Sequence, residues 1–135
     1  TLCGTRGLSF FVADDVVTAA AIGADGLHLP EHRLRMPTNG VLRWRSAGRG
    51  LLICSAHSVL AVRKAVLLGA DAVLVSPVFE TKSHPGRQGI GVINFAGICR
   101  YAPIPVYALG GVNSVSGKTL IGSGTSGIAA IGALT

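Results

Sequence analysis

The chain has 135 residues, of which 49% are hydrophobic and 13% are charged, and twelve Lys and Arg against six Asp and Glu give a formal net charge of +6. This length suits one domain with its own core, and no apolar run reaches the roughly 18 residues that a transmembrane helix needs. The positive charge favours an anionic substrate, whereas the single Trp, without interleaved aromatic residues for stacking, argues against nucleic acid as a partner.

Six short apolar runs separated by helix-like stretches predict an α/β fold. The predicted strands cover residues 8–13, 26–29, 51–56, 72–77, 105–111 and 127–132. Apolar residues with helical spacing lie between them, in DVVTAAAIG, SVLAVRKAVLLG and VINFAGICRYA. Alternation of strand and helix is typical of a parallel sheet with right-handed crossovers.

The sequence also contains an internal repeat. AIGADGLHLP at 21–30 returns as LLGADAVLVSP at 67–77, and more loosely as LIGSGTSGIAAIG at 120–132. In each copy a glycine able to form a left-handed cap ends a helix shortly before an apolar strand.

Repetition of this kind favours a (β/α)8 TIM barrel over an open sheet. Such a barrel usually needs about 250 residues and at least about 200. We therefore expect one TIM-barrel-type domain over residues 1–135, with two strand–helix units either missing upstream or absent. The chain begins at Thr1 and its only Met is Met36, which also predicts an incomplete N-terminus.

The segment VLVSPVFETKSHPGRQGIG at 73–91 changes from an apolar strand to a polar loop. In parallel α/β folds, ligands bind in the loops after the carboxyl ends of the strands. Thr81, Lys82, Ser83 and His84 would supply hydroxyl and cationic groups suited to phosphate oxygens. An ordinary polar surface loop has the same composition.

We further expect this loop to be mobile in the empty protein and to order over a bound ligand. Its Pro and Gly residues supply hinge positions, and Phe79 and Ile90 are the apolar residues that could anchor its two ends.

Glycines follow the last two predicted strands, at Gly110, Gly111 and Gly132. Glycine lets backbone N–H groups approach a ligand closely, and Asn113 or Ser114 could cap the next helix, whose N-terminus favours an anion. Loops in this position are the usual phosphate site of such barrels. Two ordinary turns are the alternative.

His57 lies just beyond the third predicted strand, in ICSAHS, with Ser55 beside it. An imidazole titrates near pH 6.5 and can both accept and donate a proton, so His57 is a candidate acid/base. A helix-entry residue bonded to a backbone carbonyl is the alternative. His28 lies within a short strand and is interpreted as structural.

Asp14 and Asp15 follow the first predicted strand, where a carboxylate could hold Mg²⁺. Magnesium sites usually need further carboxylates or substrate phosphates, so a helix N-cap is the favoured interpretation. Cys3, Cys54 and Cys99 lie far apart and match no metal-ligand spacing. With no signal peptide in TLCGTRG, these thiols predict a reduced, cytoplasmic protein.

Taken together, ADGLHL, SAHS, GADAVLVSPVFETKSHPG, IPVYALGGVN and GIAAIGAL resemble the thiamine phosphate synthase and TenI family. The match runs in order from about Ser9 to the end. The resemblance implies a (β/α)8 barrel whose first two units are absent here. It also implies that Gly110, Gly111 and Gly132 hold the phosphate of a thiazole phosphate.

The family contains two chemistries. Its synthases join an aminopyrimidine diphosphate to a thiazole phosphate and use Mg²⁺ to neutralise the departing pyrophosphate. Their Asn-Asp motif corresponds to Ala13-Asp14, and their second acidic position corresponds to Arg33. Their T-x-T-K loop corresponds to residues 81–84, with His84 in place of the lysine. One metal carboxylate and the loop lysine are thus missing.

TenI-type members are thiazole tautomerases, which move a proton without a metal. Their S-x-H-S histidine corresponds to His57, although many synthases share this motif. We therefore predict a metal-independent tautomerase of TenI type. The resemblance implies His57 and His84 as catalytic residues, and the substrate would be bound by Ser55, Thr81, Lys82, Ser83 and the three glycines.

Two alternatives remain. One is an Mg²⁺-dependent synthase that uses Asp14, with Lys82 standing in for the neighbouring lysine. The other is a non-catalytic regulator that binds a phosphate ligand. The expected partners are a thiazole phosphate and, for a synthase, an aminopyrimidine diphosphate, with no nucleic acid and no membrane. A homo-oligomer is compatible with the sequence.

Overall fold

The computed structural model describes residues 2–81, 86 and 88–131, and its centre is a six-stranded parallel sheet. The strands lie side by side in chain order, each paired in parallel with the next. Their bounds are β1 Phe11–Ala13, β2 Gly26–Leu29, β3 Leu51–Ala56, β4 Ala72–Val75, β5 Val106–Ala108 and β6 Gly127–Ile128. Sequential order in an all-parallel sheet is the arrangement of a TIM barrel, as predicted.

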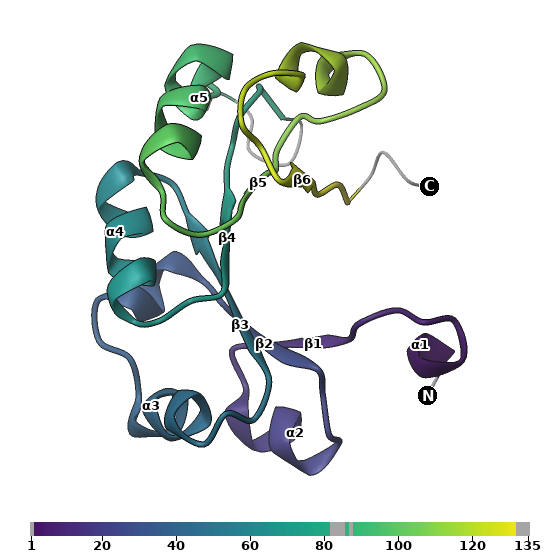
Figure 1. Cartoon of the computed structure of the whole chain (residues 1–135), viewed down its shortest axis with the longest axis vertical. Coiled ribbons are helices and arrows are strands. Elements are labelled where there is room, and N and C mark those ends of the chain that lie inside the picture. Colours follow the sequence, from purple (N-terminus) through teal and green to yellow (C-terminus); the bar gives the residue numbers. More distant parts are fainter. Residues whose placement is uncertain (1, 82–85, 87, 132–135) are drawn as a thin grey trace.

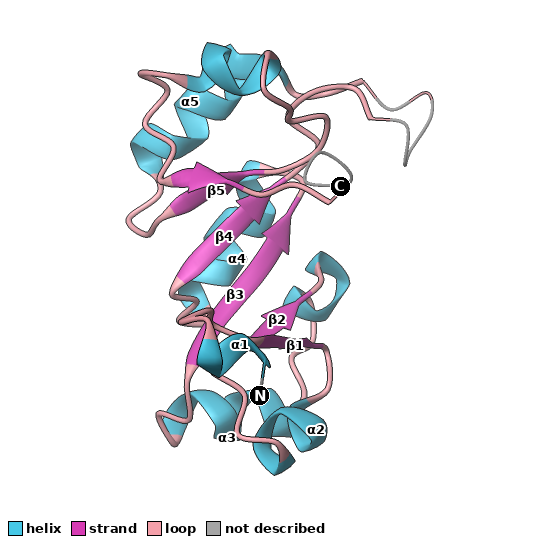
Figure 2. Ribbon diagram, turned by 90° about the vertical axis from the view of Figure 1, so that its right-hand side faces the viewer, coloured by secondary structure: helices cyan, strands magenta, loops and turns pink. Residues whose placement is uncertain are grey.

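The helices pack mainly on one face of this sheet. Figure 1 shows α3, α4 and α5 together on one side, while α1 lies on the other side, and Figure 2 shows the strands from a perpendicular direction. The helical elements are α1 Leu2–Thr5, α2 Val16–Ala21, η1 Glu31–Leu34, α3 Asn39–Ser46, α4 Val59–Leu67, α5 Gly91–Tyr101 and η2 Ser116–Leu120, where η is a 3-10 helix.

Burial within the strands follows this layering. In β3, the side chains of Leu52, Cys54 and Ala56 are fully buried, whereas Leu51 is 47% exposed and Ser55 is half-buried. Successive residues of a strand point to opposite faces, so the core lies between the sheet and its helices. The other face, which we call the inner face, carries Ser55 and is incompletely covered.

The internal repeat has a structural cause. Gly23 and Gly69 adopt left-handed φ values of 63° and 79° after α2 and α4. The aspartate two residues later then contacts the preceding strand segment in the same way in both copies. Asp25 accepts a hydrogen bond from the N–H of Phe10 and donates its own N–H to the Phe10 carbonyl. Asp71 does the same with Leu52.

The basic segment around residues 33–49 contains α3, a helix that the apolar spacing did not predict. Val41 and Trp44 are buried against the sheet, while Arg43 is exposed. Arg45 forms a two-pronged ion pair with Asp71, at 2.9 and 3.0 Å. The segment is therefore the outer surface of a helix that packs against the core.

Within the described part of the chain, every helix is too short or too polar to cross a bilayer.

Candidate active site

The carboxyl ends of the six strands meet at one edge of the sheet, because the strands are parallel. Most of the predicted site residues in the described part of the chain lie in the loops of this edge. Asp14 follows β1, η1 follows β2, and His57 follows β3. Ser76 follows β4, and Gly110 comes shortly after β5. The structure thus places these segments along one line of loops.

His57 is held by hydrogen bonds from two sides. Its Nδ1 lies 2.6 Å from the backbone carbonyl oxygen of Ser76 and 3.2 Å from the Ser76 hydroxyl. Its backbone N–H donates to the carboxylate of Glu31. A carbonyl oxygen can only accept, so Nδ1 carries the proton and Nε2 keeps its lone pair. Among the described residues Nε2 has no partner, and the side chain is exposed.

This geometry matches the predicted alternative, a residue at the entry of a helix bonded to a backbone carbonyl. The helix cap itself is the next residue, Ser58, whose hydroxyl accepts from Ala61 N–H. The carbonyl bond does not compete with acid/base chemistry, since it fixes the tautomer that leaves Nε2 basic. The catalytic role of His57 remains a prediction.

Asp14 is paired with the residue that stands at the position of the second family carboxylate. Arg33 directs its Nε at both carboxylate oxygens of Asp14, each 2.9 Å away. Asp15, by contrast, caps α2 by accepting from the N–H and the hydroxyl of Thr18, which lowers the pKa of Asp15. The predicted N-cap is therefore Asp15, and Asp14 has a different partner.

These residues do not fit a magnesium ion. Mg²⁺ requires oxygen ligands, usually one or two carboxylates together with substrate phosphates. Here both oxygens of Asp14 face a guanidinium, and a second cation next to Arg33 would be repelled. In the described ranges, no group of three or more His, Cys, Asp and Glu is placed to hold a metal.

The 3-10 helix η1 connects two of the carboxyl-end loops. Arg33 reaches the loop after β1, and Glu31 reaches the loop after β3. Leu34, at the end of η1, is buried and anchors it to the core. The short segment HLPEHR thus fixes Asp14 and the backbone of His57 relative to each other.

The inner face carries a polar pair just below this edge. Nε2 of His28 on β2 lies 2.8 Å from the hydroxyl of Ser55 on β3. Burial lowers the pKa of His28 because it disfavours the charged imidazolium. His28 is therefore a hydrogen-bonding neighbour of the predicted substrate residue Ser55.

The glycines after β5 serve packing as well as any ligand. Gly110 and Gly111 have φ values of 88° and 65°. A Cβ on Gly111 would lie 2.7 Å from the Cβ of Phe79, and one on Gly110 would lie 2.7 Å from the Cα of Pro77. Both glycines are thus required by the close approach of two loops.

The backbone N–H groups here are nevertheless open. Asn113 accepts from the N–H groups of Val115 and Ser116. The N-cap of η2 is nevertheless Val115, which makes no side-chain cap bond, so Asn113 orients the turn before η2 and is not its cap. Within the part of the chain that the structure describes, the N–H groups of Gly110, Gly111 and Val112 donate to no protein atom. Successive unpaired N–H groups in a turn can bind an anion.

The ends of the loop after β4 are anchored as predicted. Phe79 donates its N–H to the Gly110 carbonyl, and Ile90 donates its N–H to the Pro77 carbonyl. Both side chains pack against the core. Thr81 lies in the described part of the loop and is half-buried. The predicted residues Lys82, Ser83, His84 and Gly132 lie outside the described residues, as does the middle of the predicted lid.

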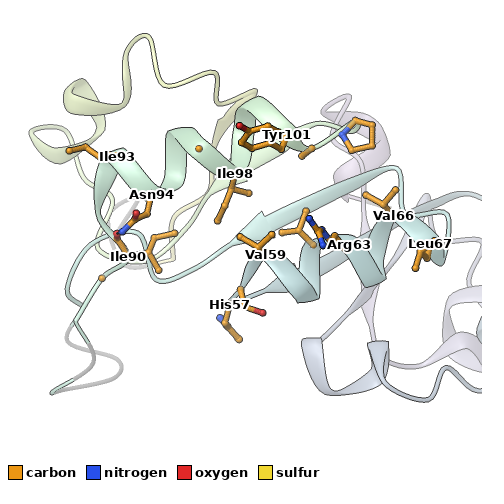
Figure 3. Close-up of a pocket in the computed structure, with 16 residues that line it drawn as sticks. His57, Val59, Arg63, Val66, Leu67, Ile90, Ile93, Asn94, Ile98 and Tyr101 are labelled. Atoms are coloured by element: carbon orange, nitrogen blue, oxygen red, sulfur yellow. The ribbon is translucent and has the colours of Figure 1, made fainter.

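A cavity of about 960 Å³ lies between α4 and α5 (Figure 3). Its walls include Val59, Val66, Ile93 and Tyr101, and His57 lies at the start of α4 within this group. Ser55, Thr81 and the glycines after β5 do not line it. Among the predicted site residues in the described part of the chain, this apolar groove on the helix side is therefore lined by His57 alone.

The chain is similar to several thiamine-phosphate synthases. The family model described as thiamine monophosphate synthase matches residues 1–134. The chain is 33% identical to a thiamine-phosphate synthase of Geobacillus thermodenitrificans, over 98% of this chain and 59% of that protein. It is 34% identical to a thiamine-phosphate synthase of Chloroflexus aurantiacus, over 95% of this chain and 58% of the relative.

A solved structure agrees with these matches. The thiamine phosphate pyrophosphorylase of Pyrococcus furiosus superimposes with a TM-score of 0.77 at 28% identity, covering 96% of this chain and 60% of the other. The chain thus spans about three fifths of the length of these relatives. Their names favour the synthase, which was the alternative in the sequence analysis, over the tautomerase.

Proposed function

The chain belongs to the thiamine monophosphate synthase family, and on this premise we propose that it forms part of a thiamine-synthesis enzyme that binds a thiazole phosphate. The observation that carries the proposal is the row of backbone N–H groups at Gly110, Gly111 and Val112 after β5, which have no acceptor among the described residues. It lies where parallel barrels bind phosphate. Thr81, in the adjoining loop, would add a hydroxyl to this site.

The reaction we propose first is the one in the relatives' names. The thiazole nitrogen attacks the methylene carbon of an aminopyrimidine diphosphate, a C–N bond forms, and pyrophosphate leaves with the electrons of the broken C–O bond. This choice replaces the tautomerase preferred in the sequence analysis, since the relatives are named as synthases. Synthases of the family use Mg²⁺, but Asp14 paired with Arg33 does not fit that ion, so no step is assigned to it here.

A second candidate is the tautomerase, and the geometry of His57 favours it. Its Nδ1–H bond to Ser76 orients the ring and leaves Nε2 as the base. A positioned acid/base of this kind contributes about 10²–10⁴ in rate. Nε2 would remove a proton from the thiazole ring and return it at a second carbon, which leaves the histidine unchanged.

We propose a cytoplasmic setting on the basis of the thiols. Cys3, Cys54 and Cys99 are all free, and unpaired cysteines are typical of a reducing compartment. We therefore place the proposed enzyme in the cytoplasm, acting on small-molecule phosphates.

One set of assays separates these functions. The full chain is incubated with thiazole phosphate and aminopyrimidine diphosphate, and separately with a thiazole carboxylate phosphate, each in EDTA and in MgCl₂. Thiamine phosphate in the first assay supports the synthase, and isomerisation in the second supports the tautomerase. Binding of thiazole phosphate without turnover would identify the regulator. No binding and no turnover would refute the proposal.

The variants His57→Ala and His32→Ala test the role of His57. His32 is an exposed histidine on η1 and makes no side-chain hydrogen bond within the described residues, so it is a matched control. If the protein is a tautomerase, we expect His57→Ala to lose at least about 10²-fold in rate while His32→Ala keeps it. Equal rates in both variants would remove His57 from the mechanism.

A further inference from the structure

We propose that the guanidinium of Arg33 replaces the divalent cation in this chain, and that its outer nitrogens bind an anionic oxygen of a diphosphate. The inference rests on the proposed function in one respect, since it concerns the same edge of the sheet. It departs from the family pattern, in which the position of Arg33 carries a carboxylate that helps to hold Mg²⁺.

The hydrogen bonding of Arg33 leaves most of its donors free. Only Nε contacts Asp14, at 2.9 Å from each carboxylate oxygen. A guanidinium has five N–H donors, and the four on the Nη atoms have no hydrogen-bond partner in the described ranges. The Arg33 side chain is 41% exposed. These outer nitrogens form the planar pair that suits two phosphate oxygens.

The backbone fixes this guanidinium in place. Asp14 has a φ of 53° and donates its N–H to the carbonyl of His28 on β2, so its carboxylate is held next to the neighbouring strand. Arg33 lies on η1, which is anchored by buried Leu34. Two residues before Arg33, Glu31 contacts the backbone of His57. The cation is therefore a fixed part of the candidate site and is attached to the loop that carries His57.

Charge explains why a metal would not take its place. With Arg33 present, the charge of Asp14 is already neutralised, and a divalent ion would have to displace the guanidinium from both oxygens. The pair also keeps the four Nη–H donors on a side chain that is partly exposed, and these can bind an anion as Mg²⁺ would. The chain therefore keeps a cation for a diphosphate while losing the need for a metal.

The first test measures binding of inorganic pyrophosphate to the full chain by calorimetry in EDTA. We expect the parent to bind, Arg33→Gln to bind at least tenfold more weakly, and Arg33→Lys to lie between them. Arg35→Gln is the control, because Arg35 is an exposed arginine two residues further on that makes no hydrogen bond or ion pair within the described residues. Its affinity for pyrophosphate should stay within twofold of the parent. No binding by the parent, or equal weakening in Arg33→Gln and Arg35→Gln, would overturn the inference.

The second test measures the binding of Mn²⁺, a paramagnetic substitute for Mg²⁺, by electron paramagnetic resonance. We expect no bound Mn²⁺ in the parent and a bound ion in Arg33→Asp, which restores a second carboxylate, and the ion should be lost again in Arg33→Asp combined with Asp14→Asn. Mn²⁺ bound to the parent and lost in Asp14→Asn alone would contradict the inference. Thermal melts of each variant confirm that it is folded.

Neither measurement needs turnover. If pyrophosphate and Mn²⁺ behave as expected but no thiazole phosphate is bound or converted, the proposed function fails and the role of Arg33 stands. If thiamine phosphate forms only with Mg²⁺ and the parent binds Mn²⁺ through Asp14, the role of Arg33 fails and the proposed synthase stands.

Discussion

Asp71 is the residue whose removal should most clearly destabilise the fold. Its carboxylate accepts a hydrogen bond from the N–H of Leu52 at 2.7 Å and two from Arg45. Leu52 is fully buried, so its N–H would be left without an acceptor in the variant Asp71→Ala.

The expected cost follows from these contacts. A buried donor left unsatisfied costs about 1–3 kcal/mol. The ion pair with Arg45 is partly exposed, with side-chain exposures of 35% and 30%, and a pair of this kind contributes about 0.2–1 kcal/mol after solvent screening. We expect Asp71→Ala to lower the free energy of unfolding by about 1–4 kcal/mol. Asp71→Asn keeps an acceptor for Leu52 and should lose less than about 1 kcal/mol.

Urea denaturation monitored by circular dichroism provides the measurement, and Asp25→Ala is the matched control. Asp25 makes the same contact with Phe10, but Asp25 is exposed, Phe10 is 41% exposed, and water can replace the lost bond. We expect Asp25→Ala to cost about 0.5–1 kcal/mol. The reasoning is refuted if Asp71→Ala lies within about 0.5 kcal/mol of the parent or equals Asp25→Ala.

Three further outcomes are expected. Burial lowers the pKa of His28 from 6.5, so below about pH 6.5 the unfolded chain binds a proton more readily than the native state does, and stability should fall as the pH drops. In His28→Asn the urea midpoint should depend less on pH over this range. An unchanged pH dependence of the midpoint would contradict this prediction. Burial raises the pKa of the Cys54 thiol to about 12, so iodoacetamide should leave Cys54 unmodified in the native protein and modify it in urea, as measured by mass spectrometry. Rapid alkylation of Cys54 in the native protein would contradict this and show that the strand opens. Gly111→Ala combines a left-handed φ of 65° with a Cβ placed 2.4 Å from the Glu80 carbonyl oxygen, so it should lower the free energy of unfolding by more than about 2 kcal/mol. Gly122→Ala, with a φ of 80° and open space around it, should lower it by about 1–2 kcal/mol. Equal melting temperatures for the two variants would show that the loop around Gly111 moves to accommodate the Cβ.

The sequence predicted the beginning of a strand well where the repeat marks it, since β2, β4 and β6 begin at the predicted residues 26, 72 and 127. β3 lies outside the repeat but also has its predicted bounds, 51–56, because its apolar run has a defined start. β6 is only Gly127–Ile128, shorter than the apolar run around it. Helix α3 was missed because its buried residues, Val41 and Trp44, are too few among arginines to produce a clear apolar period.

The sequence proposed candidate site residues, but it did not predict their contacts. Sequence placed Arg33 at an acidic position of the family pattern, but its pairing with Asp14 depends on how η1 folds against the loop after β1. Glu31 and Ser76 were not singled out, because they follow β2 and β4 and contact His57 only through the folding of the sheet. His28 was interpreted as structural, and its hydrogen bond to Ser55 is a contact that strand alternation on β2 and β3 could have indicated.

The repeated aspartate contact has a consequence for how the chain folds. Parallel sheets tend to fold slowly, because their pairings join segments that are distant in sequence and loop closure precedes any gain. Asp25 and Phe10 are 15 residues apart, and Asp71 and Leu52 are 19 apart. Each contact closes one strand–helix unit over a short loop and presents the next strand in register. The contact order is thereby kept low, and the sheet can form one strand–helix unit at a time along the chain.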